Sequence, residues 1–141
     1  MNWFSNFRYY PRPIMDRATG IIYRTPEHLY QAAKTLDLDQ RRAVAACSTP
    51  GKAKRMGRKV DIRPGWEGLK FDVMVYAQTK MVEQDPYYAA RLRQSSDEDL
   101  IEWNNWHDMT WGHCTCRSMF CKGKKPQNLM QKVLIQIRDS I

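Results

Sequence analysis

Hydrophobic and polar residues recur along most of this chain with the 3.6-residue period of α-helices. The period predicts six helices, over residues 25–36, 39–46, 49–56, 66–83, 86–94 and 127–139. Three of them begin at a capping residue followed by proline, namely Thr25-Pro26, Thr49-Pro50 and Asp85-Pro86. Such a pair favours a helix start because the first side chain accepts a free N–H and proline has none to leave unpaired. Apolar segments at 20–24 and 100–102 predict short strands. We therefore expect a predominantly helical α+β fold.

The longest expected helix, over residues 66–83, is predicted to lie at the centre of the packing. Its apolar side chains approximate one stripe, made of Trp66, Leu69, Val73, Tyr76, Ala77 and Met81. The helix before it is followed by Gly57, and glycine commonly ends a helix in the left-handed conformation. We expect Gly57 to end that helix in this way.

The helix that begins at Thr25 also carries three polar groups on one face. Glu27, Gln31 and Lys34 lie at i, i+4 and i+7, within roughly 60° of one another around the helix. The apolar side is formed by Leu29, Ala32, Ala33 and Leu36. A carboxylate, an amide and an amine on one face indicate chemistry, although a solvated face with local pairing is the alternative. His28 points about 100° away from Glu27, so we expect it to pack or to support its neighbours.

An aromatic segment lies far along the chain, over residues 100–112. It holds Trp103, Trp106 and Trp111 among polar side chains. Tryptophan is heavily buried on average, which favours a core position for at least one of the three. The polar neighbours favour the wall of a pocket in which a flat ring could stack.

Several motifs occur together in one order along the chain. They are Phe4-Ser5-Asn6-Phe7, Thr25-Pro26-Glu27-His28-Leu29-Tyr30-Gln31-Ala32-Ala33-Lys34, Ala53-Lys54-Arg55-Met56-Gly57-Arg58, Trp66, Lys70, Asp72-Val73-Met74, Ile101-Glu102, Asp108-Met109-Thr110-Trp111-Gly112 and Asn128-Leu129. In these motifs the chain resembles the NADAR family, also called YbiA-like, whose members act as N-glycosidases on ribosylated bases and related metabolites. The resemblance implies one YbiA-like domain over residues 1–141. Its pattern is broken around Asn128, where the family has glycines and this chain has Pro126, Gln127 and Met130.

The resemblance also implies roles for individual residues. The catalytic set would be Glu27, Lys34 and Asp108, and the substrate-binding set Asn6, Gln31, Lys54, Arg58, Trp111, Gly112 and Asn128. Two routes to cleavage stay open. In one, Glu27 and Asp108 form a pair of carboxyl groups that protonates the leaving nitrogen and stabilises an oxocarbenium-like transition state. In the other, Lys34 attacks a ring-opened ribose as a Schiff-base nucleophile while Glu27 moves protons.

The chain is strongly basic, with a net charge of +8 and a pI near 9.5. Such a surplus favours anionic partners, although a merely soluble basic surface is the alternative. The helix start at Thr49 followed by Lys52, Lys54 and Arg55 is a candidate phosphate site. We expect the partner to be a phosphorylated ribosyl or ADP-ribosyl small molecule, and the surplus leaves room for modified DNA or RNA.

The resemblance implies a hydrolase that cleaves the N-glycosidic bond between ribose C1 and a base or an exocyclic amine. Candidate substrates are ADP-ribosylated guanine and the ribosylamino-pyrimidine intermediates of riboflavin synthesis. The alternative is a non-catalytic module that binds ADP-ribose, NAD or nucleic acid. Such a binding module needs the pocket but not the acid, so the presence of Glu27, Lys34, Asp108 and Trp111 together favours the enzyme.

The four cysteines are expected to be reduced thiols, because the first residues lack the features of a signal peptide. No apolar run reaches about 18 residues, so we expect a cytoplasmic protein without a membrane partner. We expect no required cofactor. A zinc site formed by His113, Cys114, Cys116 and Cys121 is kept as an alternative, since the spacing departs from Cys-x-x-Cys. If zinc is bound, it should brace the basic loop.

Overall fold

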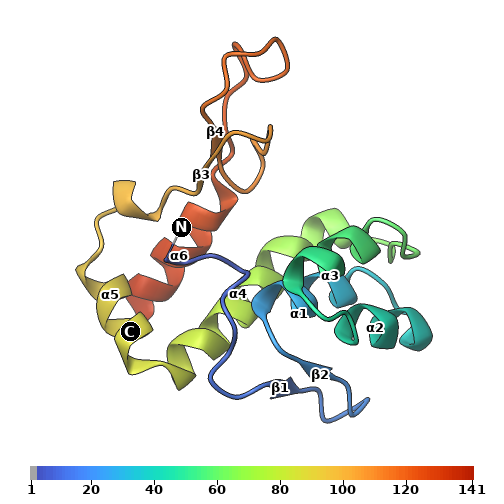
Figure 1. Cartoon of the computed structure of the whole chain (residues 1–141). Helices are drawn as coiled ribbons and strands as arrows, with labels where there is room; N and C mark the ends of the chain where they lie inside the picture. Colours follow the sequence, from blue (N-terminus) through green and yellow to red (C-terminus); the bar gives the residue numbers. More distant parts are fainter. Residues whose placement is uncertain (1–2) are drawn as a thin grey trace. The chain divides into compact units, whose positions relative to one another are not determined.

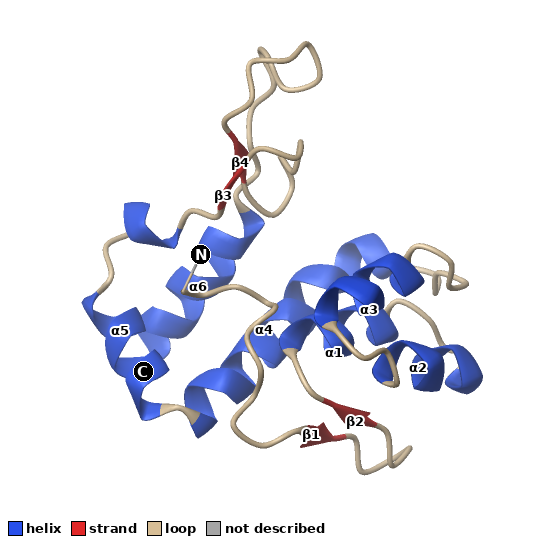
Figure 2. Ribbon diagram, in the orientation of Figure 1, coloured by secondary structure: helices blue, strands red, loops and turns tan. Residues whose placement is uncertain are grey.

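The computed structural model describes residues 3–141 (Figure 1). Its helices are α1 (Pro26–Ala33), α2 (Leu38–Ala45), α3 (Pro50–Gly57), α4 (Trp66–Gln84), α5 (Pro86–Gln94), the short 3₁₀ helix η1 (Glu98–Leu100) and α6 (Leu129–Ser140). Its strands are β1 (Ile14–Met15), β2 (Ile22–Tyr23), β3 (Trp103–Asn104) and β4 (His113–Cys114). Figure 2 shows that helices make up much more of the chain than strands do. The predicted helix-rich α+β class and all six predicted helices are confirmed, with small differences at the helix ends.

The chain divides into two compact units, residues 3–86 and residues 87–141. In the first unit, α1 contacts α2, α3 and α4, and β1 pairs antiparallel with β2. In the second, α6 contacts η1, and β3 pairs in parallel with β4. The prediction of one domain over residues 1–141 stays a prediction. Within residues 3–141, no helix is both long and apolar enough to cross a bilayer.

The caps expected at Thr25 and Thr49 hold α1 and α3 in place. Thr25 Oγ1 accepts the backbone N–H of His28 at 3.1 Å, and Thr49 Oγ1 accepts that of Lys52 at 3.1 Å. The core around these helices is formed by Ile21, Tyr23, Leu29, Ala32, Val44, Ala45, Ala53, Val60 and Ala77. The sequence signals for these two helix starts are therefore accurate, and they fix where the polar face of α1 begins.

The buried face of α4 differs from the predicted stripe. Leu69 and Tyr76 are 37% and 51% exposed, whereas Met74 and Gln78 are buried. Trp66, Ala77 and Met81 are buried as expected. The observed face is turned by roughly 70° around the helix axis from the predicted one, at 100° per residue. The prediction for Leu69 and Tyr76 is wrong because this helix also has apolar residues outside the predicted stripe, namely Phe71, Met74 and Val75, so the pattern does not define a single direction.

Gly57 does not end α3 in a left-handed conformation, so that prediction is also wrong. It is the last residue of the helix, and Arg58 after it is right-handed with φ −74°. Over residues 3–141, glycines with positive φ stand at positions 20, 65 and 123. The reason for a glycine at 57 is contact with α1: a Cβ there would lie 2.7 Å from Cδ of Gln31 and 3.0 Å from its Cβ.

The second unit is built on α6, whose buried face packs with other apolar side chains of this unit. The buried side chains of the unit include Tyr88, Leu92, Leu100, Met130, Val133, Leu134 and Ile137. The strand predicted at 100–102 is wrong in position, since Leu100 closes η1 and β3 begins at Trp103. A long irregular segment extends beyond β3 and β4 before the chain returns to α6 (Figures 1 and 2).

Candidate active site

The polar face of α1 is buried at its start. Glu27 is 5% exposed and Gln31 4%, which excludes the solvated alternative for these two residues. Gln31 Nε2 donates a hydrogen bond of 2.7 Å to Glu27 Oε1, as the i, i+4 spacing allows. A carboxyl group held in this way has a fixed direction and little contact with bulk water.

Asn6 closes the other side of the Glu27 carboxyl group. Its backbone carbonyl accepts the N–H of Glu27 at 3.1 Å, and its side chain hydrogen-bonds the Glu27 carboxylate. The amide of Gln78 in α4 donates in turn to Asn6 Oδ1. Gln78 is 1% exposed and was missed by the sequence reasoning. A glutamine on the inner face of a long helix is the signal that could have found it.

The contact between α1 and α3 depends on Gly57. Its missing side chain leaves the space that the Gln31 amide occupies, so the two helices approach closely at this point. Among residues 3–141, Gln31 Oε1 is a buried side-chain oxygen without a hydrogen-bond partner. The Gln31 amide nitrogen therefore donates to Glu27, while its oxygen is buried against Gly57.

Burial shifts both ionisable groups of the face toward their neutral forms. It raises the pKa of Glu27, against the Gln31 hydrogen bond and the charges of Lys54 and Lys34. It lowers the pKa of Lys34, where the Glu27 carboxylate opposes the shift and Arg58 and Lys54 add to it. The structure therefore brings together predicted residues from separate parts of the sequence. Lys34 and Lys54 lie close enough to act on the Glu27 carboxyl group, and Lys54 and Arg58 close enough to act on Lys34.

Two buried aromatic rings pack beside the amine. Lys34 Nζ stands 5.7 Å from the centre of the Tyr30 ring, and the Tyr30 and Trp66 rings are 5.3 Å apart at an angle of 56°. Tyr30 and Trp66 are 6% and 5% exposed, so they belong to the core that holds this end of α1 and are closed to a stacking ligand.

His28 supports the helix and lies on another face. Its Nδ1 is 2.8 Å from Thr25 Oγ1, and its Nε2 is 2.9 Å from the Cys47 carbonyl oxygen, which only accepts. Nε2 therefore carries a proton, and burial lowers the pKa of the ring, which favours the neutral form. The expected packing role of His28 is confirmed.

The remaining predicted residues gather in the second unit. Asp108 Oδ1 accepts the backbone N–H groups of Thr110 at 3.0 Å and Trp111 at 2.9 Å. The Thr110 carbonyl accepts the N–H of Leu129, which follows Asn128. Asn128 has a left-handed backbone with φ 50°, and its Oδ1 is buried without a partner among the described residues. Asp108, Trp111 and Asn128 thus belong to one loop pair.

Gly112 packs closely against its own chain, and two of the three tryptophans are exposed. A Cβ on Gly112 would meet the Glu102 carbonyl oxygen and lie 2.9 Å from Asn104 Nδ2, so the close approach that this glycine permits is to the chain itself. Trp103 and Trp106 are 54% and 58% exposed and Trp111 is half-buried, so the expectation that at least one of the three lies in the core is wrong. Trp103 instead stacks on His113, with ring centres 4.7 Å apart.

The structure divides the predicted catalytic residues between the two units. Glu27 and Lys34 lie in residues 3–86 and Asp108 in residues 87–141. The pairing of Glu27 with Asp108, and the roles given to Trp111, Gly112 and Asn128, stay predictions.

A cavity of about 940 Å³ lies elsewhere in the first unit. Its lining includes Leu29 and Ala33, which lie roughly 120–160° around α1 from Glu27 and Gln31. None of the predicted site residues is part of that lining. The chemistry expected of α1 is therefore on its other face.

Comparison with known proteins identifies the family. The family model of the NADAR domain matches residues 1–141. The chain belongs to the NADAR family. This NADAR chain is 34% identical to the N-glycosidase YbiA of Escherichia coli strain K12 over 111 residues, which is 77% of the chain and 66% of that protein. It thus spans slightly less than two thirds of that relative.

Two further relatives extend the comparison. The NMR structure of Escherichia coli YbiA matches with a TM-score of 0.77 and 30% identity, covering 97% of this NADAR chain and 76% of the solved chain. The riboflavin biosynthesis protein PYRR, chloroplastic, of Zea mays is 27% identical over 98% of this chain and 23% of that protein. The first match agrees with the helix-rich α+β fold described above.

Proposed function

We propose that this chain is an N-glycosidase, a hydrolase that breaks the bond between ribose C1 and nitrogen in a phosphorylated ribosyl compound. The observation that carries the proposal is the buried Glu27, whose pKa is raised by burial and which lies beside the half-buried amine of Lys34. Membership of the NADAR family and the printed name of the YbiA relatives support it.

In the acid–base route, protonated Glu27 donates its proton to the leaving nitrogen while the bond to C1 breaks. A water molecule adds its oxygen to C1 and returns a proton to the Glu27 carboxylate, which restores the acid. A raised pKa keeps the carboxyl group protonated closer to neutral pH, where a general acid is useful. Gln31 and Asn6 hold the carboxyl group in one direction throughout.

The lysine route applies to ribose attached through an exocyclic amine. The sugar ring opens to an imine at C1, and the neutral Lys34 amine adds to C1 and expels the substrate amine, leaving a Lys34 Schiff base. Water then cleaves the C1=N bond, which frees Lys34 and the aldehyde of the sugar. Burial lowers the pKa of Lys34, which increases the share of neutral amine.

Lys54 and Arg58 are proposed to bind the substrate phosphates, because both contribute positive charge close to Lys34. Two substrate classes contain the required bond and phosphates. The name of the maize relative supports a ribosylamino-pyrimidine phosphate. The net charge of +8 supports ADP-ribosylated guanine, free or in nucleic acid.

Four free cysteines fit a reducing compartment, and we propose the cytoplasm.

The test is product release, followed by chromatography, from ADP-ribosylated guanine in DNA and from a ribosylamino-pyrimidine phosphate. We compare wild type with Glu27→Gln, and use Glu98→Gln as the control because Glu98 is an exposed carboxylate on η1. The expected result is cleavage of one substrate and a loss of roughly 100-fold or more in Glu27→Gln, the size typical of acid–base help. A folded wild type that binds these compounds without cleaving either would establish the binding module instead.

Borohydride separates the two routes. It reduces a Schiff base to a stable amine, so the lysine route gives a chain whose mass increases by the sugar phosphate, and Lys34→Met abolishes the adduct. Lys59→Met is the matched control, since Lys59 is an exposed lysine just beyond α3. Turnover of the same substrate without any adduct assigns the reaction to the acid–base route.

A further inference from the structure

Four metal-binding side chains converge in the irregular segment between β3 and α6. They are His107, Cys114, Cys116 and Cys121, and we call them the Cys3His cluster. Their ligand atoms all lie within 4.8 Å of one another. We propose that the Cys3His cluster binds one structural zinc ion that holds this segment together.

The spacing of the atoms fits a tetrahedral ion. His107 Nδ1 is 3.3 Å from Cys116 Sγ and 3.4 Å from Cys121 Sγ, and the backbone N–H of Cys116 reaches Cys114 Sγ at 3.4 Å. Zinc binds sulfur at about 2.3 Å and nitrogen at about 2.0 Å, which puts ligand atoms roughly 3.5–3.8 Å apart. Small side-chain movements would complete the site.

The histidine of the cluster differs from the one expected from the sequence. His113 stacks on Trp103 and is no part of the cluster, so its prediction as a ligand is wrong. His107 reaches the thiols because its own backbone is left-handed, with φ 72°, which turns the chain back toward Cys116 and Cys121. His113 directly precedes Cys114 in the sequence, whereas the histidine of the Cys3His cluster stands seven positions before Cys114.

The choice of zinc follows from the ligands. Thiolate sulfur with imidazole nitrogen favours zinc over magnesium or calcium, which prefer oxygen. Four protein ligands leave no open position for a water molecule, so the ion is structural. The segment also needs such a contact, because its Met119 and Phe120 are 87% and 69% exposed and bury little apolar surface.

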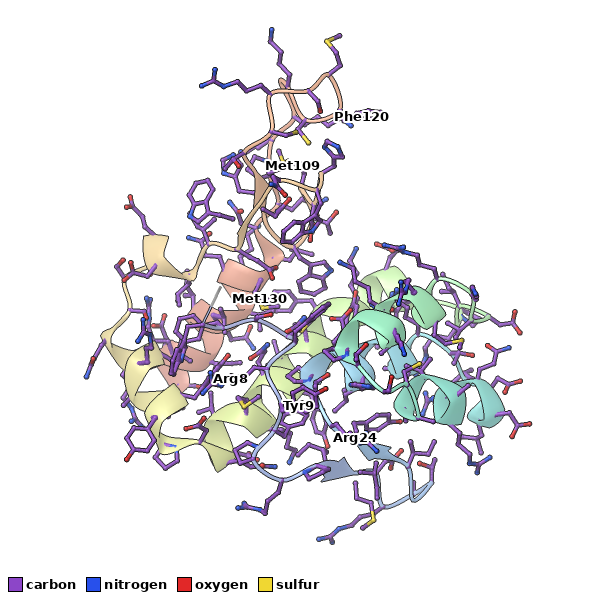
Figure 3. The ribbon with its side chains drawn as sticks, viewed as in Figure 1. Arg8, Tyr9, Arg24, Met109, Phe120 and Met130 are labelled. Atoms are coloured by element: carbon purple, nitrogen blue, oxygen red, sulfur yellow. The ribbon has the colours of Figure 1, made fainter. Side chains whose placement is uncertain are left out.

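The site lies in the same segment as the loop that holds Asp108. Figure 3 labels Met109 and Phe120 in this segment. The Phe120 ring is 5.2 Å from the His107 ring, and the Met109 sulfur accepts the N–H of Cys114 at 3.3 Å. His107 precedes Asp108 directly, so an ion on His107 would also restrict the backbone of Asp108.

The experiment measures metal in the full chain, purified under reducing conditions without chelator and then dialysed. We expect about one zinc ion per chain by elemental analysis. Replacement with Co²⁺ should give sulfur-to-cobalt charge-transfer absorption and the visible bands of tetrahedral cobalt. Absence of stoichiometric zinc both as purified and after incubation with ZnCl₂ would overturn the proposal.

Two matched pairs test the ligand set. His107→Ala should weaken zinc binding by roughly 100-fold or more, whereas His113→Ala, the other histidine of the segment, should not. Cys121→Ser should do the same, whereas Cys47→Ser, a free cysteine of the first unit, should leave zinc bound. Equal zinc affinity in His107→Ala and His113→Ala would refute this site.

Two readouts keep the result clear. Wild-type Co²⁺ spectra do not depend on the folding of any variant. Mass spectrometry of the intact chain, purified under reducing conditions, shows whether the cysteines are oxidised, because each disulfide lowers the mass by about 2 Da. A cluster that is oxidised and binds no zinc would assign the cysteines to a redox role and exclude the metal.

Discussion

Gly57→Ala tests the close approach of α1 and α3 most directly. The added Cβ would lie 2.7 Å from Gln31 Cδ and 3.0 Å from Gln31 Cβ, and it would meet the amide oxygen of the same residue. Gln31 cannot move away freely, because its Nε2 donates to the buried Glu27 carboxyl group at 2.7 Å. We expect the substitution to push the amide off Glu27 and to separate the two helices.

The magnitude follows from three opposing effects. Overpacking a dense contact costs about 1–3 kcal/mol. Loss of the Gln31–Glu27 hydrogen bond costs about 1 kcal/mol more. Alanine in a helix is favoured over glycine by about 1 kcal/mol, which offsets part of the cost. The expected net decrease in the free energy of unfolding is therefore about 1–3 kcal/mol.

The assay is urea unfolding monitored by circular dichroism, with Gly68→Ala as the control. Gly68 lies inside α4, is exposed, and has no atom within 4 Å of a Cβ at its position. The same exchange at Gly68 should stabilise the protein by about 0.5–1 kcal/mol. Similar results at both glycines would refute the close contact. Combining Gly57→Ala with Gln31→Ala should give a cost smaller than the sum of the single changes.

Two other outcomes are expected from the first unit. Burial holds the folded pKa of Glu27 above its ordinary 4.5, so the native state keeps a proton that the unfolded chain loses. The free energy of unfolding should therefore fall as pH rises from 4.5 through the folded pKa. Urea unfolding at a series of pH values measures this fall, and Glu27→Gln should make it smaller. The same pH dependence in wild type and Glu27→Gln would contradict the raised pKa. His28→Ala should destabilise the protein by roughly 2–4 kcal/mol, because it leaves a cavity and the Cys47 carbonyl without its ring partner. A loss under 1 kcal/mol in the same assay would argue against a neutral ring bonded at both nitrogens.

The helices could be predicted because their signals are local. Thr25-Pro26 and Thr49-Pro50 specify a cap and a first turn with no help from the rest of the chain. The polar face of α1 was predictable for the same reason, since Glu27 and Gln31 are four residues apart on one helix.

The errors concern contacts between segments distant in the sequence. A glycine after a basic run can end a helix or admit a neighbouring side chain, and only the position of Gln31 decides this for Gly57. Likewise, the ligand role of His107 depends on a left-handed backbone that no local pattern required. Gln78 was missed because its partner Asn6 is 72 positions away.

The hydrogen bonds of Asn6 also bear on how this domain can be cut from a longer chain or fused to another. A boundary drawn at the first helix would start near Thr25 and keep every helix of the fold. It would nevertheless remove the amide that touches the Glu27 carboxyl group and the acceptor that Gln78 needs. A shortened chain of that kind would lack Ile21 and Tyr23 of the core as well as the environment of its acid, so inactivity in such a fragment would say nothing about the family's chemistry.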